Sequence, residues 1–144
     1  MSFVVWNDRI SVEVEELDAD HKKMVEMIND LYDAILAGNG RKKLDRLLDR
    51  LVDYTRYHFA REEAWMERIG FPDLAAHKQE HEKMAAWINT AWRDYHSSTA
   101  MAPSLETMNL LKDWLFGHIL GSDQKYAAFQ RERVIQGSRA AATP

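Results

Sequence analysis

Four segments of the chain carry apolar side chains at spacings of three and four residues, which is the period of an amphipathic α-helix. Gly, Asn, Ser and Pro residues separate the segments, and these residue types end helices and form turns. The spacing predicts helices from near Leu17 to Ala37, from about Arg41 to Ile69, from about Asp73 to Tyr95, and from near Ser104 onward. No strand pattern competes with this interpretation.

Short connectors force sequential helices to lie antiparallel beside one another. The expected fold is therefore all-α, an antiparallel up-down-up-down four-helix bundle that follows an extended N-terminal arm carrying Trp6. We expect one domain over residues 1–135. The small and polar residues 136–144 are expected to form a flexible C-terminal tail.

Composition excludes several classes of function. The chain has no cysteine, so any bound metal must be held by nitrogen and oxygen ligands. The net charge of −4, with scattered Lys and Arg, gives no basic stripe for nucleic acid. No apolar run approaches the roughly 18 residues of a membrane span, and no N-terminal signal pattern is present. We expect a soluble cytoplasmic protein, either a monomer or a weak oligomer.

Five of the six histidines fall in the apolar stripes, where an ordinary bundle would carry Leu or Ile. The stripes are completed by His21 in the first helix, His58 and Glu62 in the second, His77 and His81 in the third, and His118 in the fourth. Burying such polar groups is costly unless something satisfies them. The pattern therefore indicates a polar site inside the bundle.

The inward histidines also share one height along the bundle. His21 lies 16 residues before Ala37, and His58 lies 17 residues after Arg41. Because consecutive helices are antiparallel and rise by roughly 1.5 Å per residue, these two rings stand at the same level. His81 and His118 agree in the same way, each lying 14 residues from the turn that joins the third and fourth helices.

The pairs His58/Glu62 and His77/His81 place two ligands one turn apart on one helix face, the spacing that a metal ion needs from a rigid helix. Asp123 does not fit a regular helix, because five residues after His118 it is about 140° away from the inward face. If Asp123 is a ligand, the helix must slip in phase near Gly121. We therefore predict a π-bulge or break between His118 and Asp123.

The motifs His58-Phe-Ala-Arg-Glu62-Glu63, His77-Lys-Gln-Glu-His81 and Trp114-Leu-Phe-Gly-His118-Ile-Leu-Gly-Ser-Asp123, together with inward His21, closely resemble the hemerythrin family, specifically its bacterial members. The resemblance covers about residues 3 to 130. It implies two iron ions with an oxo or hydroxo bridge. By this resemblance His77, His81 and His118 hold one iron, His21 and His58 hold the other, and Glu62 and Asp123 bridge them.

The resemblance further implies that molecular oxygen binds at an open position of the second iron, with Leu115 and Ile119 as the apolar wall over it. Two departures from the family pattern are Met84, where Phe is common, and Asp20, where Gln is common. Neither departure removes a ligand. Met84 is expected to affect the packing of the oxygen pocket, and Asp20 is expected to affect the local electric field at the centre. Glu63, next to Glu62, is expected to face outward into solvent.

Three classes of function are compatible with such a centre: an oxygen carrier, store or sensor; a di-iron enzyme with peroxidase, oxidase or nitric-oxide-handling activity; and a bundle in which metal is only stored or joins helices. The open position argues against the third class, and the lack of a recognisable polar substrate pocket argues against the second. A histidine-rich centre also stays more cationic than a carboxylate-rich oxygenase centre. We therefore expect reversible oxygen binding and no enzymatic activity.

A single inward histidine is more often a hydrogen-bonded core residue than a metal ligand. That alternative would here require five coincidences at one height. His96, beside Ser97 at the end of the third helix, is the one histidine expected to lie outside the cluster, exposed to solvent.

Overall fold

The regular structure in residues 3–142, the part of the chain that this computed structural model describes, is entirely helical. The elements, in chain order, are the 3-10 helix η1 (Asp8–Ile10), α1 (Glu15–Leu36), α2 (Arg41–Ile69), α3 (Leu74–Ser97), α4 (Leu105–His118), the π-helix η2 (Ile119–Asp123) and α5 (Gln124–Ala142). Among these described residues, no helix is both long enough and apolar enough to cross a membrane.

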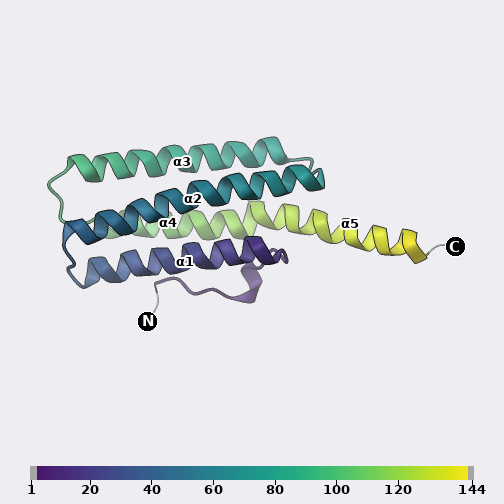
Figure 1. Cartoon of the computed structure of the whole chain (residues 1–144), viewed down its shortest axis with the longest axis horizontal. Helices are drawn as coiled ribbons and strands as arrows, with labels where there is room; N and C mark the ends of the chain where they lie inside the picture. The colour runs from purple at the N-terminus through teal and green to yellow at the C-terminus, as the bar shows by residue number, and fades with distance from the viewer. Residues whose placement is uncertain (1–2, 143–144) are drawn as a thin grey trace.

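The helices form an antiparallel four-helix bundle, which confirms the predicted fold (Figure 1). α1, α2 and α3 each supply one rod, and α4, η2 and α5 together supply the fourth, whose C-terminal part extends beyond the other three (Figure 1). The predicted bounds of α2 agree with the structure, and α3 continues two residues beyond the predicted Tyr95.

Local capping fixes where the rods begin and end. Gly70 takes a left-handed conformation with φ 71° after α2, a conformation that costs a glycine little. The side chain of Ser104 accepts a hydrogen bond from the amide of Thr107 at 3.1 Å and so caps the start of α4. At the other connection, the guanidinium of Arg41 donates to the carbonyls of Tyr95 at 2.9 Å and Ser98 at 2.7 Å, joining the start of α2 to the end of α3.

The predicted N-terminal arm packs along α1 and includes the short 3-10 helix η1. Val4 exchanges two hydrogen bonds of 2.8 Å with the side chain of Asn29. Further along, the carboxylate of Asp18 accepts from the amide of Val12 at 2.8 Å and from the hydroxyl of Ser11 at 2.6 Å. These contacts hold the first turns of α1 in place, next to His21.

A polar layer divides the interior into two apolar clusters. The larger cluster includes Met24 of α1 and Leu51 of α2, and the smaller includes Leu17 and Trp65 of the same two helices. Along α1 and α2, the buried polar side chains between the two clusters are Asp20, His21, Thr55, His58 and Glu62. The other two rods complete the layer with His77, His81, His118 and Asp123. The apolar clusters keep water from both sides of this layer.

The predicted irregularity between His118 and Asp123 is confirmed as the five-residue π-helix η2. A π-helix bonds each amide to the carbonyl five residues earlier, so residues five apart lie on one face. The extra residue therefore returns Asp123 to the face of His118, and α5 resumes behind it with Tyr126 buried.

Residues 136–142 of the expected tail are helical, because α5 continues to Ala142, and their flexibility stays a prediction. Ala140, Ala141 and Ala142 have the highest helix propensity of any residue type, which outweighs the small size and polarity that indicated a tail. Residues 143 and 144 of the predicted tail lie outside the described residues.

Replacing Asn29 by alanine removes both hydrogen bonds that hold Val4 of the arm on α1. We expect the free energy of unfolding to fall by about 2 kcal/mol, because a net hydrogen bond contributes about 1 kcal/mol. Urea denaturation followed by circular dichroism measures this change. Asp30→Ala, at an exposed neighbouring position, is the control and should stay within about 0.5 kcal/mol of the unaltered protein. Equal losses in both variants would contradict the role given to Asn29.

Candidate metal centre

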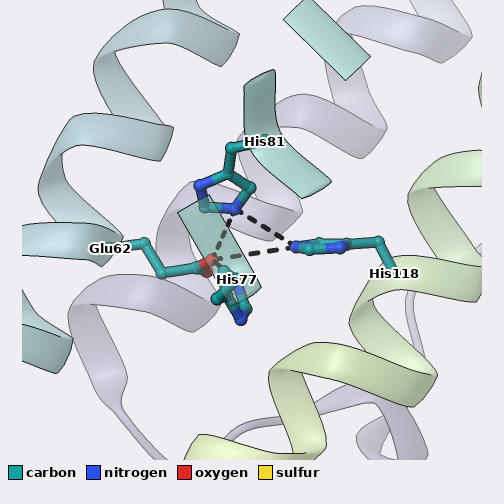
Figure 2. Close-up of side chains that lie close together, drawn as sticks. All are labelled: Glu62, His77, His81 and His118. Carbon is teal, nitrogen blue, oxygen red and sulfur yellow. Dashed lines mark hydrogen bonds and ion pairs between the residues drawn. The ribbon is translucent and has the colours of Figure 1, made fainter. Parts of the chain in front are cut away.

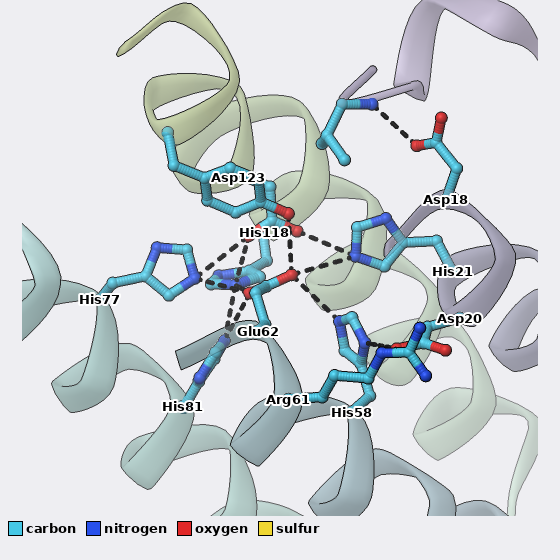
Figure 3. Close-up of polar contacts among 12 residues, drawn as sticks. Asp18, Asp20, His21, His58, Arg61, Glu62, His77, His81, His118 and Asp123 are labelled. Carbon is cyan, nitrogen blue, oxygen red and sulfur yellow. Dashed lines mark hydrogen bonds and ion pairs between the residues drawn. The ribbon is translucent and has the colours of Figure 1, made fainter. Parts of the chain in front are cut away.

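Each rod of the bundle sends side chains into the polar layer, and Figure 3 shows them converging. α1 supplies His21, α2 supplies His58 and Glu62, α3 supplies His77 and His81, α4 supplies His118, and η2 supplies Asp123. All seven are buried. The structure therefore brings together every residue that the sequence predicts for a metal site.

Glu62 stands at the middle of the cluster and faces two separate groups of imidazoles. Its Oε1 lies 2.8 Å from Nε2 of His77 and 3.1 Å from Nε2 of His81. Its Oε2 lies 3.3 Å from Nε2 of His21 and 3.1 Å from Nε2 of His58. The two carboxylate oxygens thus point at two different sets of donors.

Asp123 spans the same two groups. Its Oδ1 lies 3.2 Å from Nε2 of His77 and 3.0 Å from Nε2 of His118, and its Oδ2 lies 3.2 Å from Nε2 of His21. The donors accordingly form one group around Glu62, His77, His81 and His118 (Figure 2) and a second around His21, His58 and Glu62. Two carboxylates shared between two donor groups are suited to bridging a pair of metal ions.

The separations between donor atoms fit metal coordination. Adjacent ligands at about 2.1 Å from an octahedral ion stand about 3 Å apart. The nitrogen and oxygen atoms of this cluster lie 2.8 to 3.3 Å from their nearest partners across both groups. Imidazole with carboxylate is a donor set that suits iron as well as zinc and manganese.

The outer nitrogens of three histidines are held by carboxylates. His58, His81 and His118 donate from Nδ1 to Asp20, Glu63 and Glu80 at distances of 3.0, 2.9 and 2.9 Å. This bond fixes the proton on Nδ1, so Nε2 of a neutral ring presents a lone pair to the interior. Nε2 of His81 and Nε2 of His118 lie only 3.2 Å apart. Two lone pairs at that distance repel, unless a proton or a metal cation lies between them.

Several buried polar atoms are left without a hydrogen bond among the described residues. They include both ring nitrogens of His21 and both carboxylate oxygens of Asp123. The nearest opposite groups are within 3.0 to 3.2 Å of Asp123, but they are not aligned for hydrogen bonding. A buried polar atom without a partner costs about 1–3 kcal/mol. Metal coordination would satisfy Nε2 of His21 and both oxygens of Asp123.

Without a metal, the cluster must hold protons to balance its carboxylates. Burial by itself lowers the pKa of His77, but contacts with Asp123 and Glu62 raise it to about 9. Burial also lowers the pKa of His21 and His118, but the same two carboxylates raise these pKa values to about 9 for His21 and about 10 for His118. Burial opposes the ionisation of Glu62, yet the surrounding imidazoles hold its pKa well below the usual range. A metal ion entering this site therefore has to displace protons from the rings.

Aromatic and apolar side chains enclose the donors. Phe59 stacks on the ring of His81 at 3.9 Å, and Trp114 stacks on the ring of His118 at 4.7 Å. Leu115 lines a small apolar cavity with Phe59, and Ile119 is fully buried at the start of η2. These contacts restrict rotation of the imidazole rings and exclude water.

Two expectations about the surroundings need correction. Glu63 was expected to face solvent, but it accepts the hydrogen bond of His81, because that ring turns its outer nitrogen toward α2. His96 does lie outside the cluster, as predicted, yet it is half-buried against Trp92, with ring centroids 4.1 Å apart.

Sequence reasoning also missed Tyr126, whose hydroxyl donates to Oε2 of Glu62 at 2.9 Å, and Glu80, which binds His118. The position of Glu80, three residues after His77 and next to His81, was the available signal.

Known proteins resemble this chain over most of its length. The family model described as Hemerythrin HHE cation binding domain matches residues 12–129. The bacteriohemerythrin of Stenotrophomonas maltophilia is 36% identical over 139 residues, which cover 96% of this chain and 89% of that protein. The bacteriohemerythrin of Methylococcus capsulatus is 33% identical over 127 residues, which cover 88% of this chain and 95% of that protein.

A solved structure agrees with these sequence relatives. The crystal structure of a wild-type hemerythrin superposes with a TM-score of 0.81 at 32% identity, covering 88% of this chain and 97% of that one. Because the family model spans most of the chain and close relatives cover nearly all of it, this chain belongs to the hemerythrin family.

Proposed function

We propose that this chain binds molecular oxygen reversibly at a di-iron centre inside the bundle. The observation that carries the proposal is the division of the donors into two groups joined by both oxygens of Glu62 and both oxygens of Asp123. The match to relatives named bacteriohemerythrin supports it. One domain, residues 1–135, carries this function.

The proposed ligands follow from the two groups. His77, His81 and His118 hold one iron, His21 and His58 hold the other, and Glu62 and Asp123 bridge them, with an oxo or hydroxo group as the third bridge. The second group offers one imidazole fewer, so its iron keeps an open position for oxygen. When bound, the two irons supply the two electrons that reversible oxygen binding requires.

The apolar wall beside the centre keeps water and protons away from that open position. Leu115 and Ile119 are both buried and lie on the same rod as His118. Leu115 lies one turn before His118, and Ile119 directly follows it. We propose that they form the oxygen pocket. A dry pocket disfavours proton delivery, so oxygen leaves unchanged.

Binding is favoured over catalysis by the composition of the centre. Five imidazoles and two carboxylates leave a pair of ferrous ions more cationic than a carboxylate-rich centre would, which opposes oxidation beyond the ferric state. The cavity beside Leu115 is lined mainly by apolar and aromatic side chains, which suits a small apolar ligand better than a polar substrate. We therefore propose an oxygen carrier, store or sensor and place a di-iron peroxidase, oxidase or nitric-oxide-handling enzyme second.

Anaerobic reduction of the iron-loaded protein, followed by air and then vacuum, tests the proposed function. We expect a visible charge-transfer band to appear in air and to disappear under vacuum over repeated cycles. The absorption spectrum measures both steps. A protein that retains zinc and stays colourless, or that oxidises irreversibly in a single exposure, would contradict reversible oxygen binding.

His77→Ala should reduce the iron content below two ions per chain, because His77 contacts both bridging carboxylates. His96→Ala is the matched control on the same helix, and it should retain the iron content of the unaltered protein. Metal analysis and circular dichroism together separate iron loss from unfolding. Equal iron content in the two variants would remove His77 from the ligand set.

The metal-free and metal-loaded proteins should respond oppositely to pH. The raised pKa values of His21, His77 and His118, about 9 to 10, contribute stability that is fully present below pH 6.5 and is lost as pH rises through 9 to 10. The Tm of the metal-free protein should therefore fall between pH 6.5 and 8.5. The increase in Tm produced by zinc should grow over the same range, because zinc competes with fewer protons. If the curves of Tm against pH with and without zinc run parallel, zinc and protons do not compete for these imidazole rings.

A further inference from the structure

Asp20 is a buried carboxylate that lies just outside the proposed ligands (Figure 3). Its Oδ2 accepts a hydrogen bond from Nδ1 of His58 at 3.0 Å and lies 3.5 Å from Nε of Arg61. Its Oδ1 accepts from the hydroxyl of Tyr54 at 3.0 Å. All three neighbours are donors, so this arrangement suits an ionised carboxylate, which only accepts.

The three carboxylates that hold histidine Nδ1 atoms differ in their exposure. The side chains of Glu63 and Glu80 are 25% and 44% exposed, whereas that of Asp20 is only 6% exposed. Solvent screens the first two charges. The charge of Asp20 acts through protein of lower effective dielectric, where the same charge has a stronger effect. Of the three carboxylate partners, that of His58 is therefore the one that solvent screens least.

A carboxylate that accepts the Nδ1 proton makes the opposite nitrogen of the ring a stronger donor. Nε2 of His58 points to the group that contains His21, while His81 and His118 belong to the other group. The second ring of the same group, His21, has no hydrogen bond at Nδ1 among the described residues. The donor strength of the two-histidine group thus depends on the contact between His58 and Asp20.

We propose that Asp20 is a positioning residue that orients His58 and increases its donor strength, and so lowers the reduction potential of the iron in the two-histidine group. This inference rests on the proposed function, because it assigns a potential to one of the proposed irons. A stronger donor stabilises ferric over ferrous iron. Since oxygen binding withdraws electrons from the irons, Asp20 also strengthens oxygen binding.

Tyr54 limits this effect. Its hydroxyl donates to the oxygen of Asp20 that His58 does not use, and so withdraws negative charge from the carboxylate. Removing the hydroxyl should leave more charge on Oδ2 and strengthen the bond to His58. Asp20 and Tyr54 are therefore expected to act on the iron in opposite directions, although both belong to one hydrogen-bonded chain.

This opposition distinguishes an electronic role from a purely structural one. Asp20 joins α1 to α2 through His58 and Tyr54, so a structural role alone predicts that both substitutions loosen the centre alike. An electronic role predicts potential shifts of opposite sign. Asp20→Asn keeps the size of the side chain and one acceptor oxygen, and Tyr54→Phe removes only the hydroxyl.

The experiment measures the ferric/ferrous midpoint potential of the iron-loaded protein by spectroelectrochemistry. We expect Asp20→Asn to favour the ferrous state about tenfold, which corresponds to a rise of about 59 mV for one electron. Tyr54→Phe should lower the potential by a smaller amount. Glu63→Gln, at the partly exposed partner of His81, is the control and should shift the potential less than Asp20→Asn. Shifts of the same sign in the Asp20 and Tyr54 variants, or no shift in Asp20→Asn, would overturn the proposal.

A second measurement does not depend on iron or oxygen. In the zinc-loaded protein, the NMR signal of the His58 Nδ1 proton should move upfield in Asp20→Asn and downfield in Tyr54→Phe. An unchanged signal in both variants would refute the inference even if oxygen binds reversibly. Failure of the unaltered protein to take up iron would instead refute the proposed function, and the zinc measurement would still decide the role of Asp20. If Asp20→Asn does not fold, Tyr54→Phe alone must give the downfield signal and the lower potential.

Discussion

The burial of eight ionisable side chains in one layer is the constraint on which the rest of this structure depends. An isolated charge in a protein interior is strongly disfavoured, so Glu62 and Asp123 require compensating positive charge at short range. In the absence of metal that charge comes from protons on the imidazoles, and with metal it comes from the cations themselves. Either source works only while the donors remain within about 3 Å of one another. The fold has to hold that spacing.

Rigid rods with fixed ends provide this precision. Sliding one helix by a single turn would displace its ligands by about 5.4 Å, enough to separate them from the others. Arg41 prevents such a slip at one end by binding the last carbonyls of α3, and the left-handed Gly70 sets a tight turn at the other. The apolar clusters on both sides of the layer then oppose axial movement, because sliding would bring polar groups into apolar contacts.

The heights and faces of the ligands could be predicted because a helix converts residue number directly into position. The same rule places Asp123 off the inward face of a regular helix, so its role as a ligand predicted the irregularity η2 from the sequence. Glu63 could not be predicted, since the direction of an outer ring nitrogen depends on side-chain rotation and on the neighbouring rod. In the sequence, Asp20 stands out only as a departure from the family pattern. Its contacts with Tyr54 and His58 could not be predicted, because they depend on how α1 packs on α2. The helical conformation of residues 136–142 could not be predicted, because composition does not distinguish a small polar coil from an alanine-rich helix.

The two halves of the centre differ in more than the number of histidines. The three-histidine group is flanked by Glu63 and Glu80, whose charges water can screen, whereas the two-histidine group is flanked by the buried Asp20. A ferric ion with fewer imidazoles would by itself be the less stabilised of the pair. Under the proposal, the buried carboxylate would offset that deficit on the side to which the open position is assigned. A buried carboxylate beside the three-histidine group would instead widen the difference in ferric stability between the two irons. The two irons would then give their electrons less equally to one oxygen molecule.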